Sequence, residues 1–372
     1  MLPALKSNAP SLADVLQSSL AATDGAENRL GLKPVDSAIV LLVDGLGADN
    51  LRARVGHART LGAAFTSKSV IESGFPTTTA AAITSLTTGV APGQHGLVGY
   101  SVLDPAHDRV INQLSGWDAD LDPATWQLER TIFERAAVPA FAVGPARYDD
   151  SGFSQAVLRG AKYVPAESLT ERMARAAELA REPALIYVYA PELDMAAHSY
   201  GWESDRWTRA LESVDAAAAA LVDALPKRAG LLVTADHGII DVPQHQHVLF
   251  DTVAGLIDGL SHIAGEPRAL QLHFAPDSTA QQRSRTLALW QEHEGGRSWV
   301  VTRDEAVAAG WFGAVRPEVL PRIGDVIVAA RKGIAYYDSR TANDRARAMV
   351  GQHGSWSPAE VRVPLLRFGA FA

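Results

Sequence analysis

The chain has 372 residues, of which 47% are hydrophobic and 20% are charged, as in an ordinary globular protein with one large domain or two smaller ones. Cysteine is absent, which excludes cysteine nucleophiles and Cys-ligated zinc, so any metal must be held by His, Asp or Glu. The net charge of −8 argues mildly against a large nucleic-acid footprint, and no nucleic-acid polymer is expected as a partner.

The amino-terminal residues lack the basic stretch, apolar run and small-residue cleavage site of a signal peptide. No run of about 18 or more apolar residues occurs, so no membrane span is expected. We therefore expect a cytoplasmic protein. Residues 1–29 are interpreted as an N-terminal extension that packs on the core. Nothing in the sequence specifies an oligomeric state.

Five short apolar runs are typical of buried parallel strands, and helix-like stretches lie between them. The runs are Ala38–Val43, Ala140–Val143, Ala184–Tyr189, Leu231–Thr234 and Val363–Phe368. Between the third and fourth of these runs, apolar residues recur at spacings of three and four from Trp207 to Leu225, which predicts a helix that Pro226 ends. The alternation predicts an α/β fold with a mostly parallel sheet flanked by helices, and ligands at the carboxyl ends of the strands.

Residues 249–323 have a different pattern, which we interpret as a small α+β insertion. The catalytic core would then comprise residues 30–248 and 324–372. We expect the chain to return to this core through Asp325–Ala330 and the final strand. The elements predicted inside the insertion are a strand over Ala269–Phe274, a helix over Thr279–Glu292 and a strand over Trp299–Thr302.

Three predicted strands run directly into acidic residues or acidic–histidine pairs. The first strand ends at Asp44, followed by a glycine turn, which is typical of a metal-binding carboxylate but also of an Asp that starts a turn or caps a helix. A later strand leads to the adjacent pair Asp236 and His237, followed by Gly238. This pair is the most specific single motif, because charged groups there are costly without a partner.

Asp194 and His198 lie four residues apart, so on a helical turn both would face one metal ion. A capping Asp and a surface His would leave the same pattern. Thr79 follows a proline and two threonines and precedes an alanine-rich helix. A hydroxyl there could attack a phosphate held at the helix N-terminus, or simply cap the helix. His353, between two glycines, is by itself as compatible with a loop histidine.

The combination is stronger than its parts: three carboxylates, three histidines and a hydroxyl, which suffice for two metal ions that clamp an in-line displacement. In chain order the motifs resemble the alkaline phosphatase superfamily, specifically its nucleotide pyrophosphatase/phosphodiesterase branch, from about Ala38 to Gly354. The sequence departs from the family pattern at Ala197 and Ala235, where the family often has Gly and Ser.

The resemblance implies two zinc ions, although other divalent metals would also fit. Asp194, His198 and His353 would hold one ion. Asp44, Asp236 and His237 would hold the other, in contact with the nucleophile Thr79. Tyr100 stands where the family usually has a phosphate-contacting Asn, and we expect it to bind substrate.

The implied function is hydrolysis of a small phosphodiester or nucleotide-like substrate through a phosphothreonine at Thr79. Three alternatives remain: a phosphomonoesterase, a phosphonate hydrolase, and a metal-binding relative without catalysis. Outside the motifs, His245 and His247 are predicted to lie in an exposed loop, and Trp202 and Trp356 to pack in the core rather than stack on substrate. The sequence does not identify the aromatic nucleoside slot of larger family members.

Overall fold

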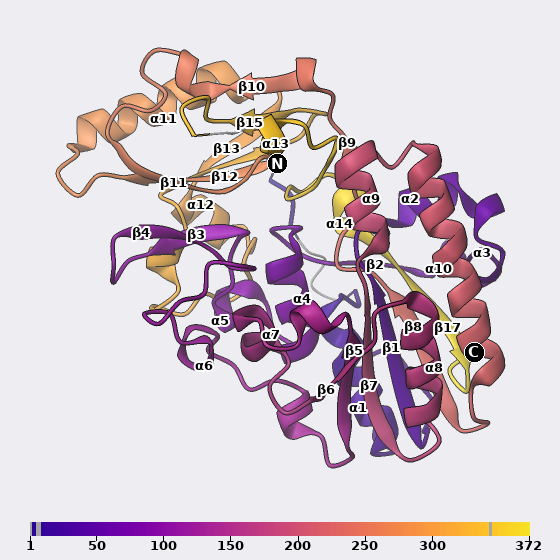
Figure 1. Ribbon diagram of the computed structural model, residues 1–372. Coiled ribbons are helices and arrows are strands. Elements are labelled where there is room, and N and C mark those ends of the chain that lie inside the picture. The colour runs from indigo at the N-terminus through magenta and orange to yellow at the C-terminus, as the bar shows by residue number, and fades with distance from the viewer. Residues whose placement is uncertain (1, 5–8, 342–343) are drawn as a thin grey trace.

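The computed structural model describes residues 2–4, 9–341 and 344–372, and Figure 1 shows two parts built around separate sheets. The larger part holds a seven-stranded sheet in the order β2-β17-β8-β1-β7-β5-β6. In that order the strands are Val70–Glu72, Arg362–Gly369, Ala229–Thr234, Ser37–Val43, Ala184–Ala190, Ala140–Gly144 and Lys162–Pro165.

Five neighbouring strands, from β8 to β6, run parallel, which confirms the predicted mostly parallel sheet. All residues of β1 are buried, as expected for a central strand covered on both faces. In the register of the sheet, Leu42 of β1 lies between Tyr189 of β7 and Thr234 of β8. The carboxyl ends of these three strands therefore lie side by side, and the predicted acidic motifs follow them.

The last strand differs from the prediction in direction. We expected Val363–Phe368 to be parallel, but β17 pairs antiparallel with both β8 and β2. The chain reaches β17 from the carboxyl end of the sheet, through a loop and the short helix α14 (Pro358–Val361). A strand that starts at that end needs no crossover and must run antiparallel to its neighbour.

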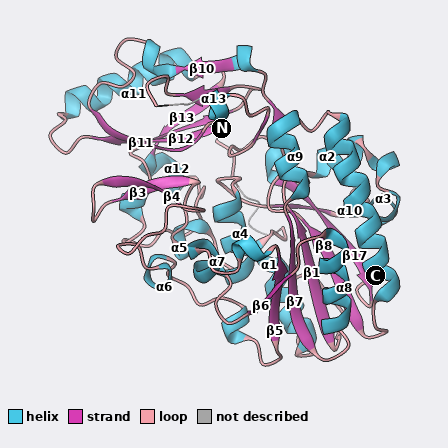
Figure 2. Cartoon of the chain, in the orientation of Figure 1, coloured by secondary structure: helices cyan, strands magenta, loops and turns pink. Residues whose placement is uncertain are grey.

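Helices cover both faces of the large sheet (Figure 2). On one side α8 packs against α10 and contacts β5 and β7, while on the other α1 packs against α4 and contacts β1. The helices of this part are α1 (Ala13–Thr23), α2 (Ala48–Ala53), α3 (Arg59–Ala64), α4 (Thr79–Thr88), α5 (Pro92–His95), α6 (Pro123–Trp126), α7 (Gly152–Val157), α8 (Leu169–Leu179), α9 (Glu192–Tyr200) and α10 (Asp205–Ala224).

Two expectations for helices are met. The predicted amphipathic helix is α10, which begins after Ser204, whose side chain accepts a hydrogen bond from the Trp207 N–H. In the N-terminal extension, Val15 and Leu16 of α1 are fully buried in the main hydrophobic core, so this segment packs on the sheet as predicted. No helix within the described ranges has the length and apolar character needed to cross a membrane.

The second sheet has six strands in the order β13-β14-β12-β11-β3-β4, all antiparallel, and forms the upper left part of Figure 1. In that order the strands are Ser298–Thr302, Val326–Ala330, Ala269–Phe274, Leu260–Glu266, Ser101–Asp104 and Arg109–Asn112. The strands and helix predicted inside the insertion are present as β12, β13 and α11 (Ala280–Glu294). We call this sheet, with α11, the second lobe.

The second lobe is larger than the predicted insertion. We expected Asp325–Ala330 to lead back into the large sheet, but β14 lies between β12 and β13 of the second sheet. The hairpin β3–β4, residues 101–112, also joins this sheet, through the pair Ser101 and Gly265. Short apolar strands do not encode their partners, so only the folded chain reveals these pairings.

The second sheet has two apolar faces. Val326 and Val328 point to a cluster beneath α11 that contains Trp290, whereas Ile327 and Ala329 belong to the main hydrophobic core. This alternation follows from the period of two along a strand. The remaining elements are α12 (Arg303–Ala308), α13 (Asp344–Arg347) and the strand pairs β10 (His247–Leu249) with β15 (Ala335–Tyr337), and β9 (Ile240–Asp241) with β16 (Gly351–Gln352).

Helix α4, whose first residue is Thr79, is fixed at its other end by a buried histidine. The Leu97 N–H donates to His95 Nδ1 (3.1 Å), and His95 Nε2 lies 3.0 Å from the Ser85 hydroxyl of α4. Burial lowers the pKa of His95 from 6.5 to about 3. The imidazole is therefore neutral in the folded protein, whereas the unfolded chain binds a proton below pH 6.5.

This difference predicts acid sensitivity. Between pH 6.5 and 3, His95 should lower the free energy of unfolding by about 1.4 kcal/mol per pH unit, because the unfolded state gains the proton. Urea unfolding of His95→Gln at pH 6.5 and pH 5.5 should show a smaller loss than the wild type. His57→Gln, which alters an exposed histidine, should behave like the wild type. An equal loss in His95→Gln and the wild type would contradict the assignment.

Candidate active site

Three neighbouring strands and two loops supply the predicted residues. Asp44 directly follows β1, and Asp236 and His237 follow the adjacent β8. Asp194 and His198 lie on α9, directly after β7, which confirms the expected helical turn. Two further residues complete the set: His353 comes from the loop between β16 and β17, and Thr79 begins α4.

One group comprises Asp44, Asp236, His237 and Thr79. His237 Nε2 lies 3.5 Å from Asp44 Oδ1, 3.5 Å from Asp236 Oδ2 and 3.3 Å from the Thr79 hydroxyl. The side chains of Asp236 and His237 are fully buried. Their ligand atoms lie close enough together, with Asp44, to hold one metal ion, as predicted.

The second group is built around Asp194. Its Oδ2 lies 3.3 Å from His198 Nε2, and its Oδ1 lies 4.0 Å from His353 Nε2. The His353 ring stacks on His237, with ring centroids 3.6 Å apart, and the ligand atoms of Asp194, His237 and His353 lie close enough together to hold one metal ion. The two groups therefore adjoin, with His237 between them. Gly45 permits this approach, since it has a φ of +74° and its Cβ position lies 3.1 Å from Asp194 Cβ.

The three histidines are oriented in the same way. Nδ1 of His237 lies 3.2 Å from the Gly238 carbonyl, that of His198 lies 2.8 Å from the Gly351 carbonyl, and that of His353 lies 2.8 Å from the Thr77 carbonyl. A carbonyl only accepts, so Nδ1 is the donor in each ring, and Nε2 is the nitrogen that has a lone pair in the neutral form. This tautomer is the one that metal-binding histidines adopt, with the second nitrogen held by a protein acceptor.

The carboxylates carry unsatisfied oxygens. Asp44 Oδ1, Asp194 Oδ1 and Asp236 Oδ2 are buried and have no hydrogen-bond partner within the protein. Burial, together with the carboxylates of Asp236 and Asp194, raises the pKa of Asp44 well above its usual range, although the Tyr189 hydroxyl donates to it. Buried anions without partners are costly, and divalent cations would remove both the desolvation cost and the mutual repulsion. The residues present therefore fit a pair of metal ions.

Thr79 is placed to act as a nucleophile. Its side chain lies at the first position of α4, where N–H groups have no intrahelical partner and the helix dipole is positive. It is 8% exposed, and it lines the same cavity as Asp44 and Asp194.

A cavity of about 220 Å³ adjoins the site. It reaches Thr79, Asp44 and Asp194 at one end. The rest of its wall is mostly apolar and aromatic, and no lining residue is Lys or Arg. The aromatic lining residues are Tyr148, Phe153, Tyr163, Tyr187 and Tyr189. Sequence reasoning missed this pocket, because its residues are spread over α4, α7, α9, β5, β6, β7 and the loops between them.

Some sequence predictions have a different outcome. Tyr100 is 38% exposed, and no described contact brings its phenol to the metal-binding groups, so its role in substrate binding stays a prediction. His245 is exposed as expected, but His247 is not in an exposed loop: it begins β10 and packs on Tyr337 with ring centroids 4.6 Å apart. Trp356 packs in the core, stacked on Phe75, as predicted.

Sequence reasoning also missed Glu266, at the end of β11 in the second lobe. Its Oε2 lies 3.7 Å from His353 Nδ1, and it is 6% exposed. Burial raises the pKa of this carboxyl well above its usual range. No sequence signal could have revealed it, since Gly265-Glu266-Pro267 reads as an ordinary turn.

A parallel α/β sheet with paired His and Asp groups and a helix-terminal hydroxyl defines the class of metal-dependent hydrolases of the alkaline phosphatase type. Residues 38–356 match the sequence profile of the type I phosphodiesterase/nucleotide pyrophosphatase family. The chain belongs to this family, as the order of its motifs suggested.

Individual relatives are distant. An uncharacterized pyrophosphatase/phosphodiesterase of Schizosaccharomyces pombe is 24% identical over 237 residues, which cover 59% of this chain and 48% of the relative, so the chain spans about half the relative's length. Murine ectonucleotide pyrophosphatase/phosphodiesterase 5 has a similar fold, with a TM-score of 0.67, 16% identity, and coverage of 89% of this chain and 88% of the other. Phosphonoacetate hydrolase from Sinorhizobium meliloti 1021, in complex with phosphonoacetate, has a TM-score of 0.68, 17% identity, and coverage of 89% of each chain.

The ligand geometry makes a prediction about metal content. Protein purified without chelators should carry about two divalent ions per chain, because two adjoining groups of ligands are present. The change His353→Ala should lower occupancy at one site and leave the other filled. Elemental analysis of both proteins measures this. Wild-type protein without bound metal would contradict the assignment.

Proposed function

We propose that this protein is a two-metal phosphodiesterase that cleaves small phosphate diesters or nucleotide-like substrates through a phosphothreonine at Thr79. The observation that carries the proposal is the convergence of three unsatisfied carboxylate oxygens, three uniformly oriented histidines and the Thr79 hydroxyl on one space. A binding protein without catalysis would have no use for a hydroxyl in that position.

The ligand sets follow the family pattern. Asp194, His198 and His353 would hold one zinc ion. Asp44, Asp236 and His237 would hold the other, next to the Thr79 hydroxyl, and other divalent metals remain possible. When bound, the two cations would stabilise the deprotonated hydroxyl and the charge on the leaving oxygen.

The residues of the chain carry out the remaining steps. The Thr79 oxygen attacks phosphorus in line, a P–O bond to it forms, and the bond to the leaving alcohol breaks. The N–H groups at the start of α4 hold the non-bridging oxygens as negative charge develops on them. Water then attacks the phosphothreonine on the opposite side, which restores the hydroxyl and releases the second product.

The charge around the site favours diesters. A monoester dianion carries two negative charges, and sites that prefer it usually add an Arg or a third cation. The stretch from Gly74 to Tyr100 has no Lys or Arg, and neither has the lining of the adjoining cavity. The second arm of a diester can enter this cavity, where aromatic rings offer apolar surface.

Removing the nucleophile provides the direct test. Thr79→Ala should lower kcat by about 10³-fold or more, with metal content unchanged, because the hydroxyl takes part in the chemistry and not in the packing. Thr79→Ser should keep part of the activity. Hydrolysis of a chromogenic diester, with elemental analysis of the same samples, measures both.

Thr88→Ala is the matched control, since it removes a buried hydroxyl at the far end of the same helix, where Thr88 donates to the Thr84 carbonyl. Thr77→Ala is unsuitable because Thr77 holds the loop of His353. Wild-type turnover by Thr79→Ala would mean that a different nucleophile acts and would refute the phosphothreonine mechanism.

Substrate preference gives a second test. We expect kcat/KM for bis(4-nitrophenyl) phosphate to exceed that for 4-nitrophenyl phosphate by about tenfold or more, equivalent to about 1.4 kcal/mol in the barrier. The physical reasons are that the cavity has no lining Lys or Arg to meet the second charge of a monoester, and that it has space for the second ester group of a diester. Steady-state kinetics on diesters, monoesters, nucleotide pyrophosphates and phosphonates would also separate the alternatives within the superfamily.

A variant that fills the cavity tests the role of the second arm. Ala142 of β5 lines the cavity, and Ala142→Leu should lower kcat/KM for the diester while the monoester is little affected. A monoester preference in the wild type would instead show that a cation enters the site. Arg147, whose guanidinium lies over the Tyr148 ring and next to Met195 at the cavity, would then be the first residue to replace.

A further inference from the structure

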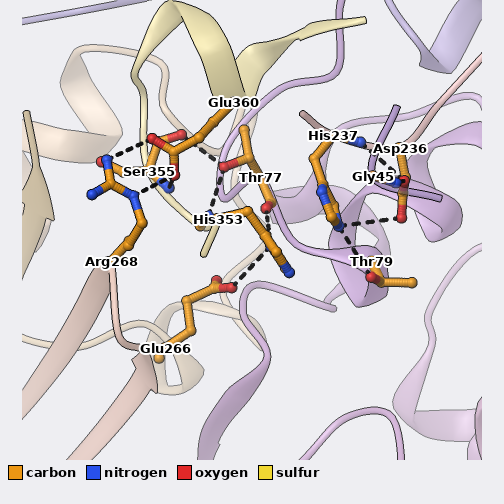
Figure 3. A network of polar contacts seen from close by, with 12 residues as sticks. Gly45, Thr77, Thr79, Asp236, His237, Glu266, Arg268, His353, Ser355 and Glu360 are labelled. Carbon is orange, nitrogen blue, oxygen red and sulfur yellow. Dashed lines mark hydrogen bonds and ion pairs between the residues drawn. The ribbon is translucent and has the colours of Figure 1, made fainter. Parts of the chain in front are cut away.

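The second lobe reaches the proposed metal centre through one buried polar network, shown in Figure 3. We infer that the turn between β11 and β12 of this lobe, with Glu266 and Arg268, positions the metal ligand His353. The inference rests on the proposed function, since it assigns these residues to the retention of a metal ion. It concerns positioning residues, because neither side chain touches the reacting atoms.

The network begins with a buried ion pair. Arg268 Nε donates to Glu360 Oε1 (2.8 Å) and Arg268 Nη2 donates to Glu360 Oε2 (2.7 Å), and both side chains are fully buried. The remaining guanidinium donors bind backbone carbonyls, at 2.9 Å for Lys332 and 2.7 Å for Ile334. All three guanidinium nitrogens of Arg268 therefore donate hydrogen bonds, so the pair fixes Glu360 of α14 to the second lobe.

Glu360 in turn holds the loop that carries His353. Its Oε1 accepts a hydrogen bond from the Ser355 N–H (2.9 Å). The Ser355 hydroxyl donates to the Ala330 carbonyl of β14 (2.7 Å), which gives the loop a second attachment to the same lobe. The loop is thus tied to the second sheet just two residues after the metal ligand.

From the other side, Thr77 of the large part clamps the same loop. Its hydroxyl donates to the Ser355 carbonyl (2.7 Å) and accepts from the Gly354 N–H (3.0 Å), and its carbonyl accepts from His353 Nδ1 (2.8 Å). The orientation of the His353 ring therefore depends on Thr77, and the position of the loop against Thr77 depends on Glu360 and Arg268.

Glu266 supports the ring from behind. Its Oε2 lies 3.7 Å from His353 Nδ1, on the side of the ring away from Nε2. Gly354, with a φ of +131°, lets the carboxyl come close: a Cβ at this position would lie 2.5 Å from Glu266 Cγ. A side chain this tightly packed limits how far the ring can retreat from Asp194. Mutation of residues that support a histidine ligand in this way commonly lowers metal affinity by about 10–100-fold.

The two parts of the network can be tested separately. Glu266→Ala removes the support behind the ring, and Glu266→Gln keeps its volume. The double variant Arg268→Met/Glu360→Leu removes the ion pair without leaving one buried charge unpaired, which would risk unfolding. The control is Arg297→Met, which breaks an ion pair with Glu294 in the same lobe while the Tyr336 hydroxyl still donates to the Glu294 carboxylate.

The measurement is the rate at which zinc leaves the full-length protein into a chromogenic chelator, which does not depend on activity. The slow and fast phases are assigned with His353→Ala and Asp236→Asn, each of which should remove one of them. We expect Glu266→Ala and the double variant to speed release from the His353 site by about tenfold or more. Release from the other site should be unchanged, and Glu266→Gln and Arg297→Met should resemble the wild type.

Several outcomes would overturn the inference. Unchanged release from a folded Glu266→Ala protein would show that the network serves stability alone, and this variant decides the matter if the double variant does not fold. Equal acceleration at both sites, or acceleration in Arg297→Met, would indicate general loosening of the lobe. A wild-type protein that holds two ions with these results leaves the proposed function intact, whereas a wild-type protein that binds no divalent metal ion refutes both.

Discussion

The whole site depends on bringing buried negative charges together. Asp44, Asp194 and Asp236 each have a buried oxygen without a hydrogen-bond partner within the protein, and the negative charges of Asp236 and Asp194 add to the cost of ionising Asp44. The fold accepts this because the parallel strands β8, β1 and β7 are held rigidly by backbone hydrogen bonds and end at one edge. The helix N-terminus, the three histidines and the hydroxyl are all arranged around that charge.

The histidines show how the backbone completes the arrangement. None relies on a carboxylate to fix its tautomer: each Nδ1–H is taken up by a carbonyl of a loop or a turn. Such acceptors stay in place when the charge of the site changes, because the peptide oxygen itself does not titrate. This arrangement requires accurate loop geometry, and the loop that carries His353 is held from two separate parts of the molecule.

Much of the large sheet could be predicted because strands such as β1 are uniformly apolar. Several of these strands end next to charged residues, which are costly to bury without a partner. The spacing of Asp194 and His198 indicated one face of a helical turn, although spacing alone did not separate a metal-binding pair from a capping Asp and a surface His. Strand partners were not: β17 and β14 have apolar sequences that suit either direction and either sheet.

Residues that come together only through tertiary packing were not predicted, for a related reason. Glu266 and the cavity beside Thr79 are formed by segments whose approach is a property of the tertiary fold and leaves no local spacing in the sequence. The domain limits stay a prediction, but the pairing of β14 and the hairpin β3–β4 shows that residues outside 249–323 contribute to the second sheet. Sequence motifs reveal residues that directly follow the strands, but they do not reveal residues that come into contact only where the two lobes pack together.

The hairpin β3–β4 has a consequence for how the chain is made. Its strand β3 pairs with β11 through Ser101 and Gly265, so this attachment is not available until about 150 further residues have been synthesised. During that interval an edge with free N–H and C=O groups is open to other chains. The charged ends of the hairpin, where Arg109 binds both Asp104 and Asp118, resist such pairing. The second lobe is therefore completed late in synthesis, after most of the proposed metal ligands have left the ribosome.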